Sequence, residues 1–429
     1  MLEKLFQLSR FGTNPKTEIV AGFTTFLTMA YIIFVNPTML ADAGMDQGAV
    51  FVATCVAAAI GCFIMGLWAN LPVALAPGMG LNAFFTYGVV LGMGHAWQTA
   101  LGAVFLSGVL FFLLSVFKLR EWVINAIPDT LKKAIAAGIG SFLALIALKE
   151  SGIIVDNPAT LVGLGDLTSF SPAMAILGLF IIIGLVQHNV TGGVMISILA
   201  ITAIAVVTGN VEYSGIVSAP PAVAPTFMQM NIAAALDVAL LSVIFAFLFV
   251  DLFDTSGTLI AVAQRAGLLT SQGKVPRLKQ ALMADSTATI TGAMMGTSST
   301  TSYIESASGV AAGGRTGMTA VVVGMLFLLA IFFAPLAAMV PVYATAGAIL
   351  YVSILMMFTL KDIRWDDLTE AAPVVVVLLL TPLTFSIAHG ITLGFITYAL
   401  AKLVSGKHQE VSVSVWVIST LLLLKVIFV

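Results

Sequence analysis

A chain of 429 residues in which 60% of the side chains are hydrophobic and only 9% are charged differs strongly from soluble domains, where about a quarter are charged. This composition excludes an ordinary water-soluble globule. The 18 Lys and Arg against 20 Asp and Glu give a net charge of -2, so the chain offers no basic field to nucleic acid. Cys55 and Cys62 share one apolar run without a cluster of histidines, and we expect neither a disulfide nor a metal site. Residues 1–10 lack the apolar core of a removable signal peptide, so we expect the chain to start in the cytosol.

Apolar runs recur along the whole chain. A membrane helix needs roughly 20 mostly apolar residues to cross about 30 Å of hydrocarbon. Eight runs are clear: 19–40, 50–69, 97–117, 131–148, 172–186, 193–208, 236–263 and 317–339. Six more are short or interrupted by Pro and Gly: 71–93, 281–295, 298–314, 342–360, 371–388 and 392–404. We therefore predict an all-α polytopic membrane protein of about 14 segments, and hydropathy leaves open whether 411–429 also spans, re-enters or lies in the interface.

The charges alternate from loop to loop. Odd-numbered loops carry mainly Asp and Glu, whereas Lys and Arg precede the first segment and follow the fourth, eighth, tenth, twelfth and fourteenth. These basic residues are Lys4, Arg10, Lys16, Lys118, Arg120, Lys132, Lys133, Arg265, Lys274, Arg277, Lys279, Arg315, Lys361, Arg364, Lys402 and Lys407. Because cytoplasmic loops carry the excess of Lys and Arg, we expect a multi-pass protein of the inner (plasma) membrane with cytoplasmic N- and C-terminal regions.

A polar, Pro-rich linker at 210–231 separates seven segments in 1–209 from seven in 232–408, and an apolar C-terminal segment follows at 409–429. Since seven is odd, two similar halves would enter the membrane in opposite directions, as in the inverted repeats of many secondary transporters. When the sequence is compared with itself at an offset of about 223 residues, the third segment falls on the tenth.

The third and tenth segments are unlike plain helices. The third contains Pro77, Gly78 and Gly80, and the tenth begins with the hydroxyl-rich run 297–302. We expect each to be a short extended stretch followed by a half-helix. Broken backbone at membrane depth is tolerated only when it is buried in protein or lines a cavity, so the pair predicts a central binding site. The alternative is that the small residues only permit close helix packing.

Three acids lie inside apolar sequence. Asp251 and Asp254 are three residues apart and would share one face of a helix, and Glu305 lies in the tenth segment. Carboxylates at membrane depth face a cavity or a partner and commonly bind substrate or protons, although an internal hydrogen-bond network is the alternative. Asn82 can donate and accept towards a ligand or cap the half-helix beside it. We place Asp285, near a basic loop, outside the site as a helix cap or ion-pair partner.

The first segment carries a kink signal at Asn36–Pro37, which we expect to end the first helix, with Tyr31 shortly before it.

The four stretches Thr28–Pro37, Ala76–Phe84, Asp251–Thr255 and Thr300–Ser306 together resemble the nucleobase cation symporters of the second type, in particular the AzgA-like adenine, guanine and hypoxanthine permeases. The resemblance covers nearly the whole chain.

The resemblance implies 14 spans in two inverted repeats, a core domain that holds the substrate, a gate domain that moves against it, and proton symport. In that family an eighth-span acid and a tenth-segment Glu bind the base, so these roles fall on Asp251 and Glu305. Gly80 and Asn82 match its third-segment substrate positions, and Asp254 matches a second eighth-span acid important for transport. The proton-coupling residues implied are then Asp251, Asp254 and Glu305.

The uracil and xanthine branches of the family carry a Gln–His pair in the first span and an amide residue after the tenth-segment Glu. This chain has neither, because Ser306 follows Glu305, and this difference favours purine bases. We expect a proton-coupled symporter that imports adenine, guanine or hypoxanthine and not an enzyme, with no cofactor, metal or nucleic acid and with the lipid bilayer as its surroundings. We expect one proton shared by Asp251 and Asp254 to couple proton movement to transport of the base.

Three alternatives remain at this point. An anion transporter of related inverted-repeat fold would need a positively charged site. An intramembrane aspartyl protease usually takes its two acids from different helices. A channel would not need paired broken segments. The sequence leaves open which purine is preferred, whether Na+ replaces H+, and whether the chain forms a homodimer.

Overall fold

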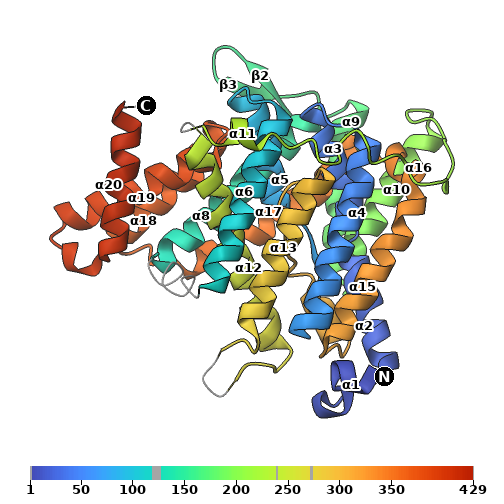
Figure 1. The fold of residues 1–429 in the computed structure, drawn as a ribbon. Helices are drawn as coiled ribbons and strands as arrows, with labels where there is room; N and C mark the ends of the chain where they lie inside the picture. Colours follow the sequence, from blue (N-terminus) through green and yellow to red (C-terminus); the bar gives the residue numbers. More distant parts are fainter. Residues whose placement is uncertain (1, 118–126, 238–239, 271–273, 429) are drawn as a thin grey trace.

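The computed structural model describes residues 2–117, 127–237, 240–270 and 274–428, and it is almost entirely helical (Figure 1). Within these ranges, nine helices are long and apolar enough to cross a membrane, and four shorter apolar helices accompany them. The long ones include α2 (Pro15–Met29) with α3 (Ile32–Asp42), α4 (Gln47–Ile64), α6 (Trp97–Val116), α8 (Asp129–Glu150), α9 (Phe170–Gln187), α12 (Leu241–Arg265), α15 (Gly317–Ala330) with α16 (Ala334–Met339), α17 (Val342–Met357) and α19 (Ile387–Val404). The shorter ones include α5 (Met79–Ala83) with the π-helix η3 (Phe84–Gly92), α10 (Gly193–Val207), α18 (Leu368–Leu383) and α20 (Val413–Phe428). The basic residues Lys118 and Arg120 lie outside the described ranges.

The first span is broken at a different place from the one that the sequence predicts. α2 begins where the Asn14 side chain accepts a hydrogen bond from Thr17 N at 3.0 Å and Pro15 takes the first helical position. The helix ends at Met29, and α3 continues through Pro37 to Asp42, so the expectation that Asn36–Pro37 ends the first helix is wrong. Pro37 has no N–H to donate to the carbonyl of Ile33, four residues earlier. The helix is interrupted at Ala30–Tyr31, just before Ile33.

Two short strands pair in the middle of the molecule. β1 (Leu75–Pro77) and β4 (Thr300–Ser302) are antiparallel, with Ala76 opposite Thr301. Strand β1 leads into α5, and β4 is followed by α14 (Ser306–Ala311). The third and tenth segments are therefore each an extended stretch followed by a helix. All six strand residues are buried.

The outer edges of both strands are satisfied by side chains of the preceding helices. Leu75 N donates to Cys62 Sγ at 3.2 Å, and Cys62 Sγ lies 3.4 Å from the Leu75 carbonyl oxygen. In the same way, Thr300 N donates to Thr289 Oγ1 at 3.2 Å, and the Thr289 hydroxyl donates to the Thr300 carbonyl at 2.9 Å. Thr289 belongs to α13 (Leu278–Met295), which precedes β4 as α4 precedes β1. Buried backbone groups need such partners because each unpaired one costs about 1–3 kcal/mol.

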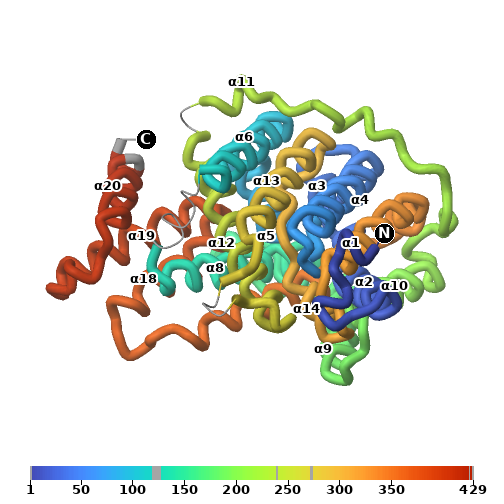
Figure 2. The backbone as a smooth tube through the Cα atoms, turned by 60° about the horizontal axis from the view of Figure 1, so that its bottom comes forward, coloured from blue at the N-terminus to red at the C-terminus, as the bar shows by residue number. Residues whose placement is uncertain are grey.

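The helices form two groups. The first group surrounds the strands and contains α2, α3, α4, α5, α6, α12, α13, α14 and α15, and the second contains α8, α9, α10, α17, α18 and α19. The packing repeats between the two halves of the chain: α6 packs on α13 as α15 packs on α4, and α17 packs on α9 as α18 packs on α8. Figure 2 shows the linker that follows α10 running along one side of the first group before the chain enters α12.

The linker is tied to the junction of α15 and α16 and to one end each of α13 and α6. Ser218 N donates to the Phe332 carbonyl at 3.0 Å, and Met228 N donates to the Met294 carbonyl at 2.7 Å. Its end is held where Asn231 N donates to the Gln98 carbonyl at 2.8 Å, directly before the short helix α11 (Ile232–Ala235). A small hairpin of β2 (Ile154–Asn157) and β3 (Leu161–Leu164) follows α8.

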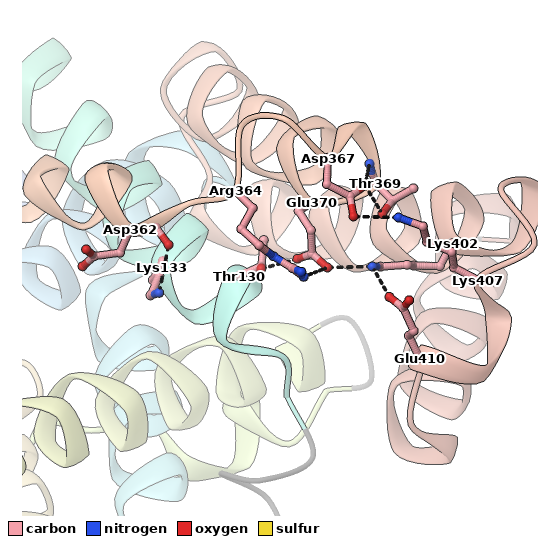
Figure 3. A network of polar contacts seen from close by, with 10 residues as sticks. All are labelled: Thr130, Lys133, Asp362, Arg364, Asp367, Thr369, Glu370, Lys402, Lys407 and Glu410. Carbon is pink, nitrogen blue, oxygen red and sulfur yellow. Dashed lines mark hydrogen bonds and ion pairs between the residues drawn. The ribbon is translucent and has the colours of Figure 1, made fainter.

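A polar network joins the ends of helices in the second group (Figure 3). The buried Glu370 of α18 accepts from Lys402 Nζ at 2.6 Å and from Arg364 at 3.0 Å, and Thr130 of α8 also donates to it. Lys402 is fully buried at the end of α19 and donates at 2.6 Å to Glu410 as well. The network therefore links α8, α18 and α19 with the segment that leads into α20.

Glu18 of α2 holds the junction between α14 and α15. Its side chain is fully buried. One oxygen accepts from Arg315 N at 2.9 Å, and the other accepts from Thr316 N at 3.3 Å and from Thr319 at 3.2 Å for the backbone N and 2.6 Å for the hydroxyl. A carboxylate here satisfies the free N–H groups at the start of α15 and favours the positive end of its dipole.

We expect Glu18→Ala to lower the free energy of unfolding by about 3 kcal/mol or more, because it leaves several buried N–H groups without an acceptor. The measurement is thermal and denaturant unfolding of the purified protein in detergent. Glu212→Ala, at an exposed position of the linker, is the matched control and should change stability by less than about 0.5 kcal/mol. Equal stability of the two variants would contradict this role of Glu18.

Candidate functional site

The predicted site residues lie around the paired strands. Asn82 and Gly80 are on α5, Asp251 and Asp254 are on α12, and Glu305 directly precedes α14. α12 packs against α14 and β4, so that the third, eighth and tenth segments meet here. The structure thus brings residues from both halves of the chain to one place.

Asp251 lies in a buried polar cluster between α12 and α13. The Asp251 side chain is 1% exposed, and its Oδ2 lies 3.1 Å from Thr289 Oγ1. Asp285, one helical turn before Thr289, lies against it, so the expectation that Asp285 is a cap or ion-pair partner outside the cluster is wrong. Oδ1 of Asp251 and Oδ2 of Asp285 receive no hydrogen bond from a donor within the described residues. Two buried carboxyl groups in contact repel each other unless a proton or a cation lies between them.

Hydroxyl groups connect this cluster to β4. Asp285 Oδ1 accepts from Thr255 Oγ1 at 2.8 Å and from Ser302 Oγ at 3.0 Å. The Thr255 hydroxyl also lies 2.7 Å from that of Thr301. The hydroxyl-rich sequence of the tenth segment therefore faces the carboxyl groups of α12 and α13.

Asp254 and Glu305 are more accessible. Although Asp251 and Asp254 are only three residues apart, Asp254 is exposed, and it lies within electrostatic reach of Glu305 as well as of Asp251 and Asp285. Glu305 is half-buried, and its Oε1 accepts from the Tyr31 hydroxyl at 2.6 Å. Tyr351 of α17 lies within electrostatic reach of Glu305, so the second helix group comes near this carboxylate.

The two α5 residues differ in their surroundings. Asn82 is fully buried, its Oδ1 accepts from Ser298 Oγ, and its Nδ2 has no partner within the described residues. It does not cap α5, whose N-cap position is Gly78. Gly80 approaches α8 closely, since a Cβ at Gly80 would lie 2.5 Å from Ile139 Cγ2. A side chain at this position would collide with the second helix group.

The sequence analysis places Asp285 outside the site and gives no site role to Thr289, Thr255 or Tyr31. The spacing of Asp285 and Thr289, four residues apart on an otherwise apolar helix, is a signal that puts both on one face. Thr255 is likewise four residues from Asp251. No comparable signal marks Tyr31, because its partner is 274 residues away in sequence.

Two cavities lie away from these residues. One of about 240 Å³ lies between α3, α4, the linker and α16 and is lined mostly by Pro, Ala and Phe. A smaller one lies between α3, η3, α8 and α17, beside Asp42, Tyr87 and Glu150. The first lacks converging polar groups, so the carboxyl groups around the strands remain the better candidate for specific binding.

Comparison with known proteins gives consistent matches. Residues 16–393 match a group of proteins described as a permease family. The chain is 51% identical over 429 residues to the adenine permease AdeP of Escherichia coli, covering 100% of this chain and 96% of the relative. It is 46% identical over 422 residues to the guanine/hypoxanthine permease PbuG of Bacillus subtilis, with 96% of each covered. The transmembrane domain of the cyanobacterial bicarbonate transporter BicA has a similar fold, with a TM-score of 0.67 and 15% identity over 87% of this chain and 97% of that one.

We expect Gly80→Ala to destabilise the protein by about 1–3 kcal/mol, because the new methyl group overlaps Ile139. Removing the opposing atom in the double variant Gly80→Ala/Ile139→Ala should recover part of the loss beyond the sum of the single effects. The matched control is Gly257→Ala on α12, where a Cβ meets nothing within 4 Å. Denaturant unfolding of the unmodified protein, Gly80→Ala, Ile139→Ala, the double variant and Gly257→Ala checks this, and purely additive effects would contradict the close contact.

Proposed function

Because this chain belongs to the permease family, and is a multi-pass membrane protein, we propose that it is a secondary transporter that imports adenine, guanine or hypoxanthine together with protons. The relatives named as adenine and guanine/hypoxanthine permeases support the substrate class. The observation that carries the proposal is the pair of broken segments, joined as β1 and β4, with carboxyl groups placed beside the junction.

We propose 14 membrane segments in two inverted repeats, 1–209 and 232–408, joined by the linker 210–231 and followed by 409–429. Counting each broken segment once and leaving aside the short helices α1 and α11 and the C-terminal α20, the described residues contain seven helical segments before the linker and seven after it. The repeated packing of the two halves and the antiparallel strands support opposite orientations. The first helix group then corresponds to a core domain and the second to a gate domain. The charge pattern supports an inner-membrane location with cytoplasmic N- and C-terminal regions.

In the proposed binding mode the base lies at the junction of core and gate. Glu305 accepts from N–H groups of the base, and Asp251, Gly80 and Asn82 complete the site from the eighth and third segments. The half-buried carboxylate of Glu305, the unpartnered Nδ2 of Asn82 and the close approach of Gly80 to α8 support this placement. Asp254, which is exposed next to Glu305, would be reached from the same side.

We propose that the coupling proton is shared by Asp251 and Asp285 and passes to the accessible side through Asp254 and Glu305. The contact of two buried carboxyl groups, each with one oxygen free of donors, supports Asp285 as the partner of Asp251 in place of Asp254. Core and gate would then move past each other only when base and proton are both present or both absent.

The first test is uptake of radiolabelled adenine, guanine, hypoxanthine, xanthine and uracil into cells that express the protein. We expect purine uptake that an uncoupler of the proton gradient abolishes. Asp251→Asn and Glu305→Gln should each reduce uptake at least about 100-fold with normal membrane expression, since each removes a carboxylate that binds charge or N–H donors. Normal uptake by either variant would refute the assignment, and no uptake of any base by the unmodified protein would favour an anion transporter.

A second test concerns Asp285. We expect Asp285→Asn to abolish proton-driven accumulation of the base while counterflow exchange of preloaded base persists, because exchange needs no net proton movement. The matched control is Asp156→Asn, at an exposed position of β2. Accumulation by Asp285→Asn at the level of the control would exclude Asp285 from coupling. Accumulation driven by a Na+ gradient in proteoliposomes would instead identify Na+ as the coupling ion.

A further inference from the structure

Thr289 of α13 lies between the carboxyl group of Asp251 and the outer edge of β4. Its side chain is fully buried. Its Oγ1 accepts from Thr300 N at 3.2 Å, and it lies 2.9 Å from the Thr300 carbonyl oxygen and 3.1 Å from Asp251 Oδ2. A threonine hydroxyl carries one hydrogen and two acceptor lone pairs. The single hydrogen therefore has two acceptors within reach and can serve only one of them at a time.

The charge of Asp251 decides which acceptor takes this hydrogen. Hydrogen bonds to an ionised carboxylate are roughly twice as strong as those between neutral groups. When Asp251 is ionised, the Thr289 hydroxyl therefore donates to Oδ2, and the Thr300 carbonyl loses its donor on the outer edge of the strand. When a proton neutralises Asp251, that advantage disappears and the hydroxyl donates to the Thr300 carbonyl, which is the shorter contact.

The titratable groups that face Asp251 within the described residues are acids. Asp285 of α13 contacts it, Asp254 lies near it on α12, and Glu305 in turn faces Asp254. None of these four acids forms an ion pair with a Lys or Arg in the described part of the chain. A proton on the pair of Asp251 and Asp285 therefore sets the charge beside Thr289.

The strand of the first half lacks such a link to an acid. Cys62 of α4 occupies the corresponding place beside β1, where its Sγ contacts both the N and the carbonyl oxygen of Leu75. Both polar contacts that Cys62 makes in the described ranges are with Leu75, so no carboxyl group competes for its hydrogen. Of the two strands, only β4 thus has an edge whose hydrogen bonding depends on the charge of a neighbouring acid.

We propose that Thr289 is a positioning residue that transmits the protonation state of Asp251 to the backbone of β4, by rotating its one hydroxyl hydrogen between Asp251 Oδ2 and the Thr300 carbonyl. The hydrogen stays bonded to Oγ1 throughout. The proposal rests on the proposed function, in which the pair of Asp251 and Asp285 holds the coupling proton. β4 ends three residues before Glu305, so the strand whose edge changes is the one that leads to the proposed base-binding carboxylate. Without the hydroxyl, the strand no longer distinguishes the two protonation states, and proton and base movements become uncoupled.

The test replaces the hydroxyl by a thiol. Thr289→Cys keeps a group that can contact both backbone atoms of Thr300, as Cys62 does at Leu75, but a thiol is a weak donor to a carboxylate. Thr289→Ser loses the same methyl group and keeps the hydroxyl. Proteoliposomes that contain the full chain are used to measure three quantities with radiolabelled adenine and hypoxanthine: accumulation driven by a pH gradient, counterflow exchange, and the protons that enter with each base. We expect the ratio of accumulation to exchange to fall about tenfold in Thr289→Cys, together with the protons per base, and to stay at the unmodified level in Thr289→Ser.

Thr291→Val is the matched control on the same helix. The Thr291 hydroxyl lies 2.9 Å from the Thr287 carbonyl oxygen, within α13 and away from the acids, so its loss should leave the ratio unchanged. Thr289→Val, which has nearly the shape of threonine but no hydroxyl, is read in the same way as Thr289→Cys if the thiol variant does not fold.

Accumulation and exchange that fall equally in Thr289→Cys, with an unchanged ratio, would mean that Thr289 only holds β4 in place and would overturn the proposal. The same ratio in Thr289→Cys and Thr289→Ser would overturn it as well. If the unmodified protein moved no protons with the base, the proposed function and this inference would both be refuted, whereas full coupling in both the unmodified protein and Thr289→Cys would refute the inference alone.

Discussion

The fold depends on satisfying the backbone groups of two extended stretches inside an apolar protein. A helix satisfies its own N–H and C=O groups, but Leu75–Pro77 and Thr300–Ser302 cannot. They pair with each other on one edge and with Cys62 and Thr289 on the other. Since each partner comes from a different helix, the position of four segments is set by these few bonds.

The same constraint determines where chemistry can occur. Because β1 and β4 replace helix in the middle of the molecule, the side chains at the start of α5 and α14 lie beside extended backbone and not beside another helix. Asp251 and Asp285 lie in the buried cluster between α12 and α13, whereas Asp254 and Glu305 are more accessible. Buried hydroxyls of Thr255, Thr289 and Ser302 contact the carboxyl groups of Asp251 and Asp285 at short distances.

Much of this arrangement is readable from residue types. The helix breakers around Pro77 and the hydroxyl run of the tenth segment coincide with β1 and β4, and the acids Asp251 and Glu305 stand out in apolar sequence. The residues that contact these groups cannot be predicted from the sequence. Asp285 is near a basic loop in sequence, whereas in space it contacts Asp251. Nothing in the sequence around Cys62 indicates that it bonds to a strand edge. Such roles depend on tertiary distances that a single sequence does not contain.

The antiparallel register of β1 and β4 also has a consequence for biogenesis. Ala76 meets Thr301, a residue that is synthesised 225 positions later, at the far side of the linker. At about 5–20 residues per second, the first strand waits at least about ten seconds with one edge unpaired. During that interval its polar groups need water, lipid headgroups or an insertion factor. The first half is therefore expected to stay near the translocation machinery until the second half arrives, and a ribosome stalled within the linker would leave an aggregation-prone product.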